Sequence, residues 1–100
     1  MSYQHYFEPR ALKEYLTALK WYKKRSYLAA PNFVKEVDTA INSICADPFR
    51  FRLSYKQFKE ISLEKYPFYI IYIIDEQKKQ VQVFSVFHFK RNPARKYKKR

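Results

Sequence analysis

The sequence contains no glycine, and this absence excludes two common kinds of nucleotide site. The P-loop and the dinucleotide-binding fingerprint both need glycine, because their backbones approach phosphate too closely for a Cβ atom. There is one cysteine, Cys45, and the two histidines lie far apart in the chain. An internal disulfide is therefore excluded, and we expect neither a zinc site nor any other cofactor.

Long hydrophobic runs are also missing. The longest apolar stretch, residues 67–74, has the length of a strand and not of a membrane span. The first ten residues do not resemble a signal peptide. A single cysteine suits a reducing compartment. We therefore expect a cytoplasmic protein without membrane contact, and we interpret Cys45 as a small buried residue, not as a nucleophile.

Acidic residues are scarce, with 9 Asp and Glu against 21 Lys and Arg and a net charge of +12. Seven of the basic residues lie within residues 90–100, where there is no acid. Charge that is both large and clustered predicts a polyanionic partner, either nucleic acid or an acidic protein, although it could serve solubility alone. We expect one domain over residues 1–100 with a basic tail at 90–100.

Hydrophobic residues make up 47% of the chain and aromatic residues 20%, which is enough for a substantial core. Residues 3–7 are typical of a short strand. Residues 8–26 have helical spacing, with an apolar stripe of Leu12, Tyr15, Leu16, Leu19 and Tyr22. A second helix is predicted over residues 31–48, ending at Asp47-Pro48, and its apolar face comprises Phe33, Val37, Ala40, Ile41 and Ile44.

The pattern changes to strands in the second half of the chain. We predict strands at residues 55–63, 67–74 and 80–89, with a four- or five-residue loop at 75–79 because no glycine is available for a tighter turn. The predicted fold is α+β with the order β-α-α-β-β-β. Two helices need one face of a mainly antiparallel sheet to cover, which leaves the other face open for binding.

The ordered set of motifs resembles the RelE/ParE superfamily of bacterial toxins from type II toxin–antitoxin modules. The motifs are EPRALKEY, WYKKRSYLAAPNFVKEVDTAINSI, DPFRF, KYPFYIIYIID and VQVFSVFHFKRNP. The resemblance implies a small α+β toxin that is wrapped and neutralised by an acidic antitoxin. It also implies one of two activities: RelE-like members cut mRNA on the ribosome, whereas ParE-like members poison DNA gyrase without a nuclease site.

Compared with RelE-like nucleases, the chain has an Arg just after the last strand, Arg91, and a Tyr six residues later, Tyr97. The resemblance implies that Arg91 binds the scissile phosphate and that Tyr97 takes part in proton transfer or base stacking. Arg suits phosphate because its planar fork stays charged. Histidine is a residue type that suits acid or base catalysis, so His88 is a candidate for that role, and Glu60 could act as a base.

Other basic residues are candidates for nucleic-acid contact: Lys56, Lys59, Lys90, Arg95, Lys96, Lys98, Lys99 and Arg100. The chain departs from the nuclease pattern in the middle of the sheet. Tyr69 stands where those nucleases have an Arg, and Glu60 and Ser62 stand where they have lysines. Lys56 and Lys59 lie close enough in sequence to compensate.

Each candidate also has a purely structural interpretation. His88 shares a strand face with Phe84 and Val86 by alternation, Tyr97 could pack on the sheet rim, and Glu60 could be a surface residue. Arg91 and Arg95 could be solvated or paired with an antitoxin. A further set, Trp21, Tyr69 and Tyr72, fits the core better than a base-stacking platform. Three hypotheses follow: a ribosome-dependent mRNA endonuclease, a ParE-like gyrase poison, and a non-toxic nucleic-acid-binding relative.

Overall fold

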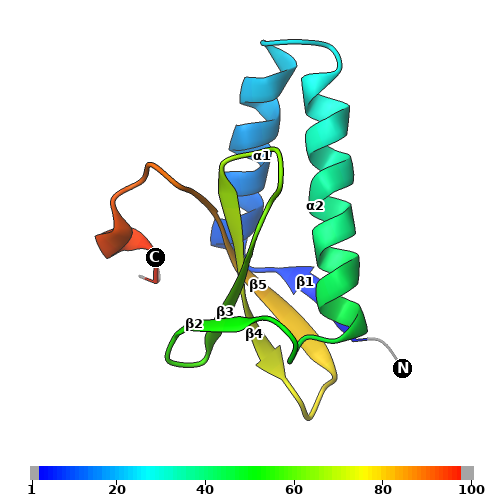
Figure 1. The fold of residues 1–100 in the computed structure, drawn as a ribbon, viewed down its shortest axis with the longest axis vertical. Helices are drawn as coiled ribbons and strands as arrows, with labels where there is room; N and C mark the ends of the chain where they lie inside the picture. The colour runs from blue at the N-terminus through cyan, green and yellow to red at the C-terminus, as the bar shows by residue number, and fades with distance from the viewer. Residues whose placement is uncertain (1–2, 98–100) are drawn as a thin grey trace.

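A computed structural model of the protein describes residues 3–97. The elements, in chain order, are β1 (Gln4–Phe7), α1 (Pro9–Lys23), α2 (Ala29–Ala46), β2 (Arg52–Tyr55), β3 (Phe58–Ser62), β4 (Phe68–Asp75), β5 (Gln80–His88) and a 3-10 turn (Pro93–Arg95). The two helices form a hairpin beside one sheet (Figure 1). Neither is long and apolar enough to cross a membrane.

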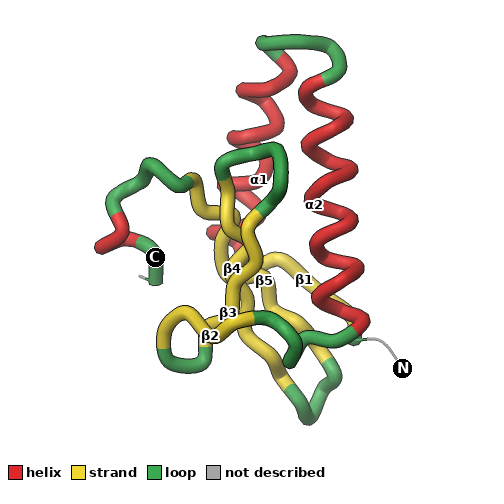
Figure 2. Tube along the Cα trace, in the orientation of Figure 1, coloured by secondary structure: helices red, strands yellow, loops and turns green. Residues whose placement is uncertain are grey.

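The sheet has the strand order β1-β5-β4-β3-β2. Only β1 and β5 run parallel, and the other neighbours are antiparallel, so the predicted α+β fold with a mainly antiparallel sheet is confirmed. The order can be followed in Figure 2. The helices are followed by four strands instead of the predicted three, because residues 52–62 fold back on themselves as the β2–β3 hairpin.

The main core lies between the helices and one face of the sheet. All five residues of the predicted apolar face of α2 are buried, and they pack against Ile70 and Tyr72 of β4 and Val81 and Val83 of β5. Tyr72 is fully buried, and its hydroxyl donates to the Pro48 carbonyl at 2.6 Å. Burial raises the pKa of Tyr72, so the hydroxyl stays a donor and holds the end of α2 to the sheet.

The predicted stripe of α1 is only partly correct. Tyr15, Leu19 and Tyr22 pack against the core, but Leu12 and Leu16 are 45% and 51% exposed. Ala11 and Ala18 are buried in their place. The buried face of α1 is therefore rotated towards small residues, which lets the helix lie close to β5.

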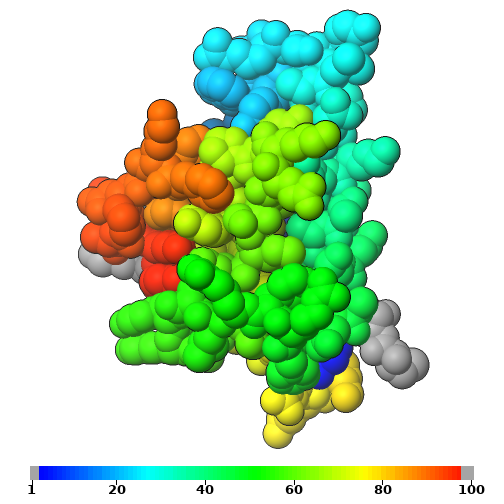
Figure 3. Space-filling model, viewed as in Figure 1, coloured from blue at the N-terminus to red at the C-terminus, as the bar shows by residue number. Residues whose placement is uncertain are grey.

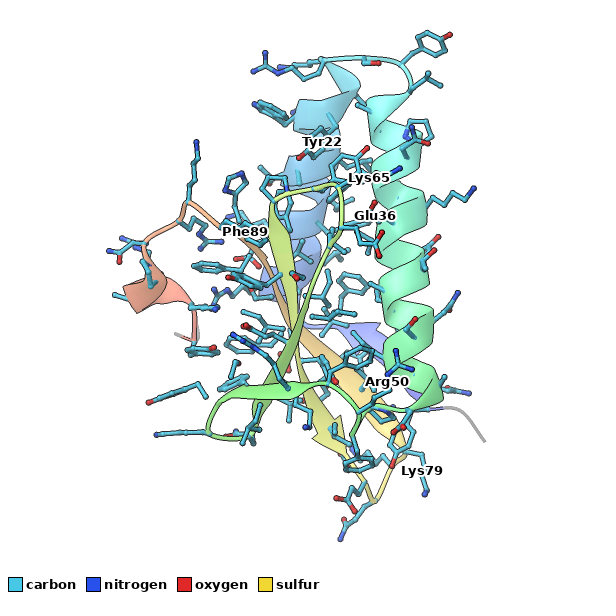
Figure 4. The ribbon with its side chains drawn as sticks, in the orientation of Figure 1. Tyr22, Glu36, Arg50, Lys65, Lys79 and Phe89 are labelled. Atoms are coloured by element: carbon cyan, nitrogen blue, oxygen red, sulfur yellow. The ribbon has the colours of Figure 1, made fainter. Side chains whose placement is uncertain are left out.

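Polar contacts join the helix hairpin to the loop between β3 and β4. Glu36 of α2 faces Lys65 of this loop (Figure 4), and its Oε1 accepts a hydrogen bond from the Lys65 backbone N–H at 2.9 Å. The Tyr66 hydroxyl donates to the Ala29 carbonyl, also at 2.9 Å. These bonds fix the far end of the hairpin relative to the sheet.

The opposite face of the sheet, which we call the far face, carries a smaller apolar cluster of Phe58, Ile71, Phe84 and Phe87. The sequence pattern predicts that this face is open. The prediction is wrong in part, because Tyr97 packs against the cluster, and the Phe89 ring and the Lys96 ammonium lie against Tyr69 of the same face. No helix longer than the 3-10 turn lies on the far face within residues 3–97.

A bulge in β5 changes which residues share a face. Ile71 pairs with Ser85 but Tyr72 pairs with Val83, so Phe84 is an extra residue in the strand. Phe84 therefore lies with Phe87 on the far face, while Val86 lies in the main core. Strict alternation places His88 with both Phe84 and Val86. Only the placement with Val86 is correct, since the centres of the His88 ring and of the ring of the core residue Phe68 are 4.9 Å apart.

The missing glycine has a cost in the two hairpin turns. Lys56, between β2 and β3, and Lys79, between β4 and β5, have φ of 50° and 53°. This left-handed region is unfavourable for a residue with a Cβ atom. The loop before β5 has four residues, as predicted from the lack of glycine.

We expect Lys79→Gly to be more stable than Lys79→Ala by about 1 kcal/mol in urea unfolding, because only glycine relieves the strain at positive φ. The comparison with alanine removes the contribution of the Lys79 ammonium, which lies 5.5 Å from the Tyr3 ring. At the neighbouring Lys78, which does not have a positive φ, the order of the two variants should reverse. Equal stability of the two Lys79 variants would show that the turn is not strained.

Candidate functional site

The candidate site is built around residues 89–97, which follow β5 and which we call the C-terminal segment. The segment leaves the sheet at Phe89, whose ring packs on Tyr69 at 4.5 Å, and Figure 4 shows Phe89 beside the sheet. It then bends at Asn92, whose side chain accepts a hydrogen bond from the Ala94 N–H. In Figure 3 the segment lies against the green β2–β3 hairpin. It thus spans from α1 to the opposite edge of the sheet.

Glu14 of α1 anchors the start of this segment. Strand β1 ends at Phe7, so β5 has no strand partner on that side beyond Val83. Glu14 Oε1 takes the place of a strand: it accepts from the Val86 N–H at 2.9 Å and from the Ser85 hydroxyl at 2.7 Å. This leaves Oε2 for cations.

Arg91, the predicted phosphate-binding residue, pairs with Glu14. Its guanidinium donates to Glu14 Oε2 and lies 4.8 Å from the Phe87 ring. Arg10 donates to the same oxygen through Nε at 3.1 Å, and its NH2 donates to the Arg95 carbonyl at 2.9 Å. One carboxylate therefore holds α1, β5 and the C-terminal segment together.

A cleft of about 890 Å³ opens beside this carboxylate, between α1 and the end of β5. We call it the α1 cleft. Its walls include Ala18, Trp21 and Tyr22 of α1, Phe68 of β4 and Val86 of β5. Its polar lining comprises Arg10, Lys13, Glu14, His88, Arg91 and Arg95. The cleft thus contains three of the predicted site residues, His88, Arg91 and Arg95.

A second carboxylate, Glu60, anchors the end of the segment on the far face. It is 3% exposed, and not a surface residue. Arg52 of β2 donates to its Oε2 at 2.8 Å, and the Lys96 ammonium lies 3.0 Å from Oε1. The Lys96 ammonium is also 4.1 Å from the centre of the Tyr69 ring. Lys96, predicted to contact nucleic acid, therefore balances a buried charge.

Tyr97 lies beside Lys96, and we call Glu60, Lys96 and Tyr97 the far-face group. The Tyr97 ring stacks on Tyr55 at 4.8 Å and packs on Phe58 at 4.9 Å. Its hydroxyl donates to the Ser54 hydroxyl at 2.7 Å. This arrangement matches the structural interpretation, in which the ring packs on the rim of the sheet. Glu60, Lys96 and Tyr97 lie together, separate from the α1 cleft.

The remaining predicted residues are dispersed. Lys56 is exposed at the β2–β3 turn, with its ammonium 5.3 Å from the Tyr55 ring. Lys59 donates to the Phe51 carbonyl at 2.8 Å. Lys90 is exposed, and its backbone N–H donates to His88 Nδ1 at 3.0 Å. Lys98, Lys99 and Arg100 lie outside the described residues.

Glu14, Arg10 and Arg52 organise the candidate site, although the sequence pattern does not mark them as site residues. Glu14 pairs with Arg91, which lies 77 positions later in the chain, whereas Arg52 pairs with Glu60 eight positions later across the β2–β3 hairpin. The only local signal is the spacing of Arg10 and Glu14 by four residues on one helix, which favours an ion pair. That signal alone does not indicate which strand the carboxylate will reach.

Within residues 3–97 no three His, Cys, Asp or Glu residues lie close enough together to hold a metal ion. Cys45 is buried, as predicted, and burial raises the pKa of its thiol. A protonated thiol is a weak nucleophile and a weak ligand.

One comparison with known proteins identifies a family for this chain. The family whose sequence pattern matches residues 6–93 is described as the ParE toxin of the type II toxin–antitoxin system parDE. No curated protein matches the chain.

Solved structures that are similar to the chain include three toxin–antitoxin systems. The intact E. coli RelBE complex matches with a TM-score of 0.65 and 20% identity, covering 90% of this chain and 100% of that one. The RelBE2 complex of Mycobacterium tuberculosis matches with a TM-score of 0.63 and 15% identity, covering 88% of this chain and 99% of that one. A chromosomal ParDE system from P. aeruginosa matches with a TM-score of 0.61 and 13% identity, covering 87% of this chain and 96% of that one. At such identities the similarity shows the fold.

We predict that Glu14→Gln lowers the free energy of unfolding by about 2 kcal/mol, because a neutral amide can replace the acceptor for β5 but not the charge that holds the two arginines. Hydrogen exchange of the backbone at residues 91–97 should become faster. The matched control is Glu64→Gln, since Glu64 is exposed and should change stability by no more than about 0.5 kcal/mol. Unchanged exchange in the Glu14 variant would contradict its anchoring role.

Proposed function

The chain belongs to the ParE toxin family of type II toxin–antitoxin systems, and from this premise we propose that it stops growth by binding DNA gyrase without cutting RNA. Gyrase is the target that resemblance to ParE-like members implies. We further propose an acidic antitoxin as the neutralising partner, since the similar solved structures include toxin–antitoxin complexes. Gyrase acts on DNA in the cytoplasm, so the proposal places the toxin there as well.

The observation that carries the proposal is that the groups which ribonuclease chemistry needs are held by separate partners. A metal-independent ribonuclease must place a cation, a base and an acid around one phosphate. Here Arg91 pairs with Glu14 at the α1 cleft, whereas Glu60 and Tyr97 belong to the far-face group. A gyrase poison needs a binding surface only, so this separation does not count against it.

The β2 edge of the sheet offers a suitable surface. Three large apolar side chains project there, with Phe49, Leu53 and Tyr55 being 50%, 62% and 46% exposed. Basic side chains alternate with them: Arg50, labelled in Figure 4, stacks on Phe51 at 4.7 Å, and Lys56 lies over Tyr55. Exposed aromatic and basic residues in alternation are typical of surfaces that bind nucleic acid or a protein–DNA complex.

The proposal is tested with purified protein in two assays run side by side. We expect gyrase supercoiling to be inhibited and gyrase–DNA cleavage complexes to accumulate, while mRNA on translating ribosomes stays intact. A double variant of the β2 edge, Arg50→Ala with Leu53→Ala, should weaken gyrase inhibition by about tenfold or more, because large exposed side chains contribute much of an interface's binding energy. Lys20→Ala on α1 is the control.

Two results would contradict the proposal. Unchanged supercoiling with toxin in excess would exclude gyrase as the target. If growth were also normal when the protein is expressed without an antitoxin, the third hypothesis would be favoured, in which the chain is a non-toxic relative that binds nucleic acid.

One contact favours the RelE-like nuclease as a second candidate. Tyr69 replaces the mid-sheet Arg of those nucleases, but the C-terminal segment brings the Lys96 ammonium to 4.1 Å from the Tyr69 ring and close to Tyr97. A cation is thus present near that position, supplied by a different part of the chain. It lies beside a buried carboxylate and a phenol, which are groups that can transfer protons.

If this second candidate is correct, Tyr97→Phe should reduce mRNA cleavage by about a hundredfold, because the hydroxyl would take part in proton transfer. The fold should be retained, since the ring keeps its packing on Tyr55 and Phe58. The readout is primer extension on mRNA bound to ribosomes. Under the gyrase proposal the same variant produces no change in mRNA, because the unmodified toxin does not cut it either.

A further inference from the structure

The α1 cleft has a chemistry that the proposed gyrase binding does not use. Its floor and walls are apolar and come from both helix α1 and the sheet, while its rim is basic. A volume of about 890 Å³ falls in the range of small-molecule sites in proteins. A ligand that matches this lining combines a flat apolar part with a negative charge.

The charge of the rim is strongly positive. Glu14 is the one acidic residue of the lining, and its carboxylate is already bound to Arg10 and Arg91. Lys13 and Arg95 are exposed on the same rim and pair with no carboxylate in the part of the chain that the structure describes. A phosphate between them would be held by at least two cations without displacing an existing ion pair.

His88 adds a donor of fixed identity. Its Nδ1 accepts a hydrogen bond from the Lys90 N–H, so the lone pair of that nitrogen is engaged. A neutral imidazole must then carry its proton on Nε2. His88 therefore offers the cleft a donor, which is what an anionic or carbonyl oxygen requires.

The aromatic wall suits a planar ring. Trp21, expected in the core from sequence, is 51% exposed at the cleft. The Arg25 guanidinium lies 4.1 Å from its ring, and Tyr22 packs edge-on at 5.1 Å, so the indole is held in place. Burial raises the pKa of Tyr22, which keeps that side of the wall uncharged. Stacking of a nucleobase on such a wall contributes to binding whatever the base.

We propose that the α1 cleft binds a nucleotide, with the base against Trp21 and the phosphate between Lys13, Arg95 and Arg91. The ligand is either a free nucleotide or an unpaired residue of a single strand, which share this chemistry. An extended acidic peptide fits less well. Such peptides usually add a strand to a sheet edge, and here the Val86 N–H at that edge is already bound by Glu14.

Trp21 is the only tryptophan of the chain, so its fluorescence reports on the cleft directly. We expect AMP to quench it saturably, and adenosine and ribose 5-phosphate to bind at least about tenfold more weakly, because each lacks half of the recognised chemistry. Lys13→Ala and Arg95→Ala should each weaken AMP binding by about tenfold. Lys20→Ala, on the same helix but outside the cleft lining, should change it by less than about twofold.

The experiment distinguishes a free nucleotide, a nucleotide of a single strand and an acidic peptide as occupants of the cleft. A single-stranded RNA tetramer that binds about tenfold more tightly than AMP would assign the site to a strand, and equal binding would assign it to the free nucleotide. The inference is overturned if neither probe quenches Trp21, if inorganic phosphate competes as well as AMP, or if an acidic peptide with one aromatic residue binds more tightly than both. Gyrase inhibition by Lys13→Ala should remain normal, so this test is separate from that of the proposed function.

Discussion

The carboxylate of Glu14 is the constraint on which the candidate site depends. Because β1 ends at Phe7, the part of β5 beyond Val83 would have buried backbone donors without a strand partner. Leaving such a donor buried without an acceptor costs about 1–3 kcal/mol. Glu14 satisfies it from a helix and has a second oxygen free for two arginines. The path of the chain after β5 follows from that pairing.

The same principle applies at the other end of the C-terminal segment. Glu60 is almost fully buried, and a buried carboxylate is stable only with partners. Arg52 reaches it from the neighbouring strand and Lys96 from the segment. Two of the basic residues that give the tail its high charge thus serve internal carboxylates. A basic tail in a sequence is therefore not by itself a measure of the charge that is available to a polyanion.

The sequence predicts those features that depend on local pattern. The buried face of α2, the end of that helix before Pro48 and the strand at 67–74 are as expected, because apolar periodicity and proline act over a few residues. It does not predict the β2–β3 hairpin, whose turn at Lys56 lacks the usual glycine, nor the bulge at Phe84. The exposure of Leu12 and Leu16 depends on how α1 meets β5. The pairs of Glu14 with Arg91 and of Glu60 with Lys96 depend on the whole fold.

These long-range pairs also explain why aligning strands is a weak guide to activity in this fold. A position on β4 that lacks a cation, Tyr69, has the Lys96 ammonium over its ring, supplied from a segment 27 positions later in the chain. Conversely, Arg91 stands at the expected place in the sequence, but its charge is directed to α1. What matters for catalysis is the position of charges around one phosphate, and not the strand that carries them. In this chain Glu14 pairs with Arg91 and Glu60 pairs with Lys96, and the proposed gyrase binding rests on that distribution of the cations.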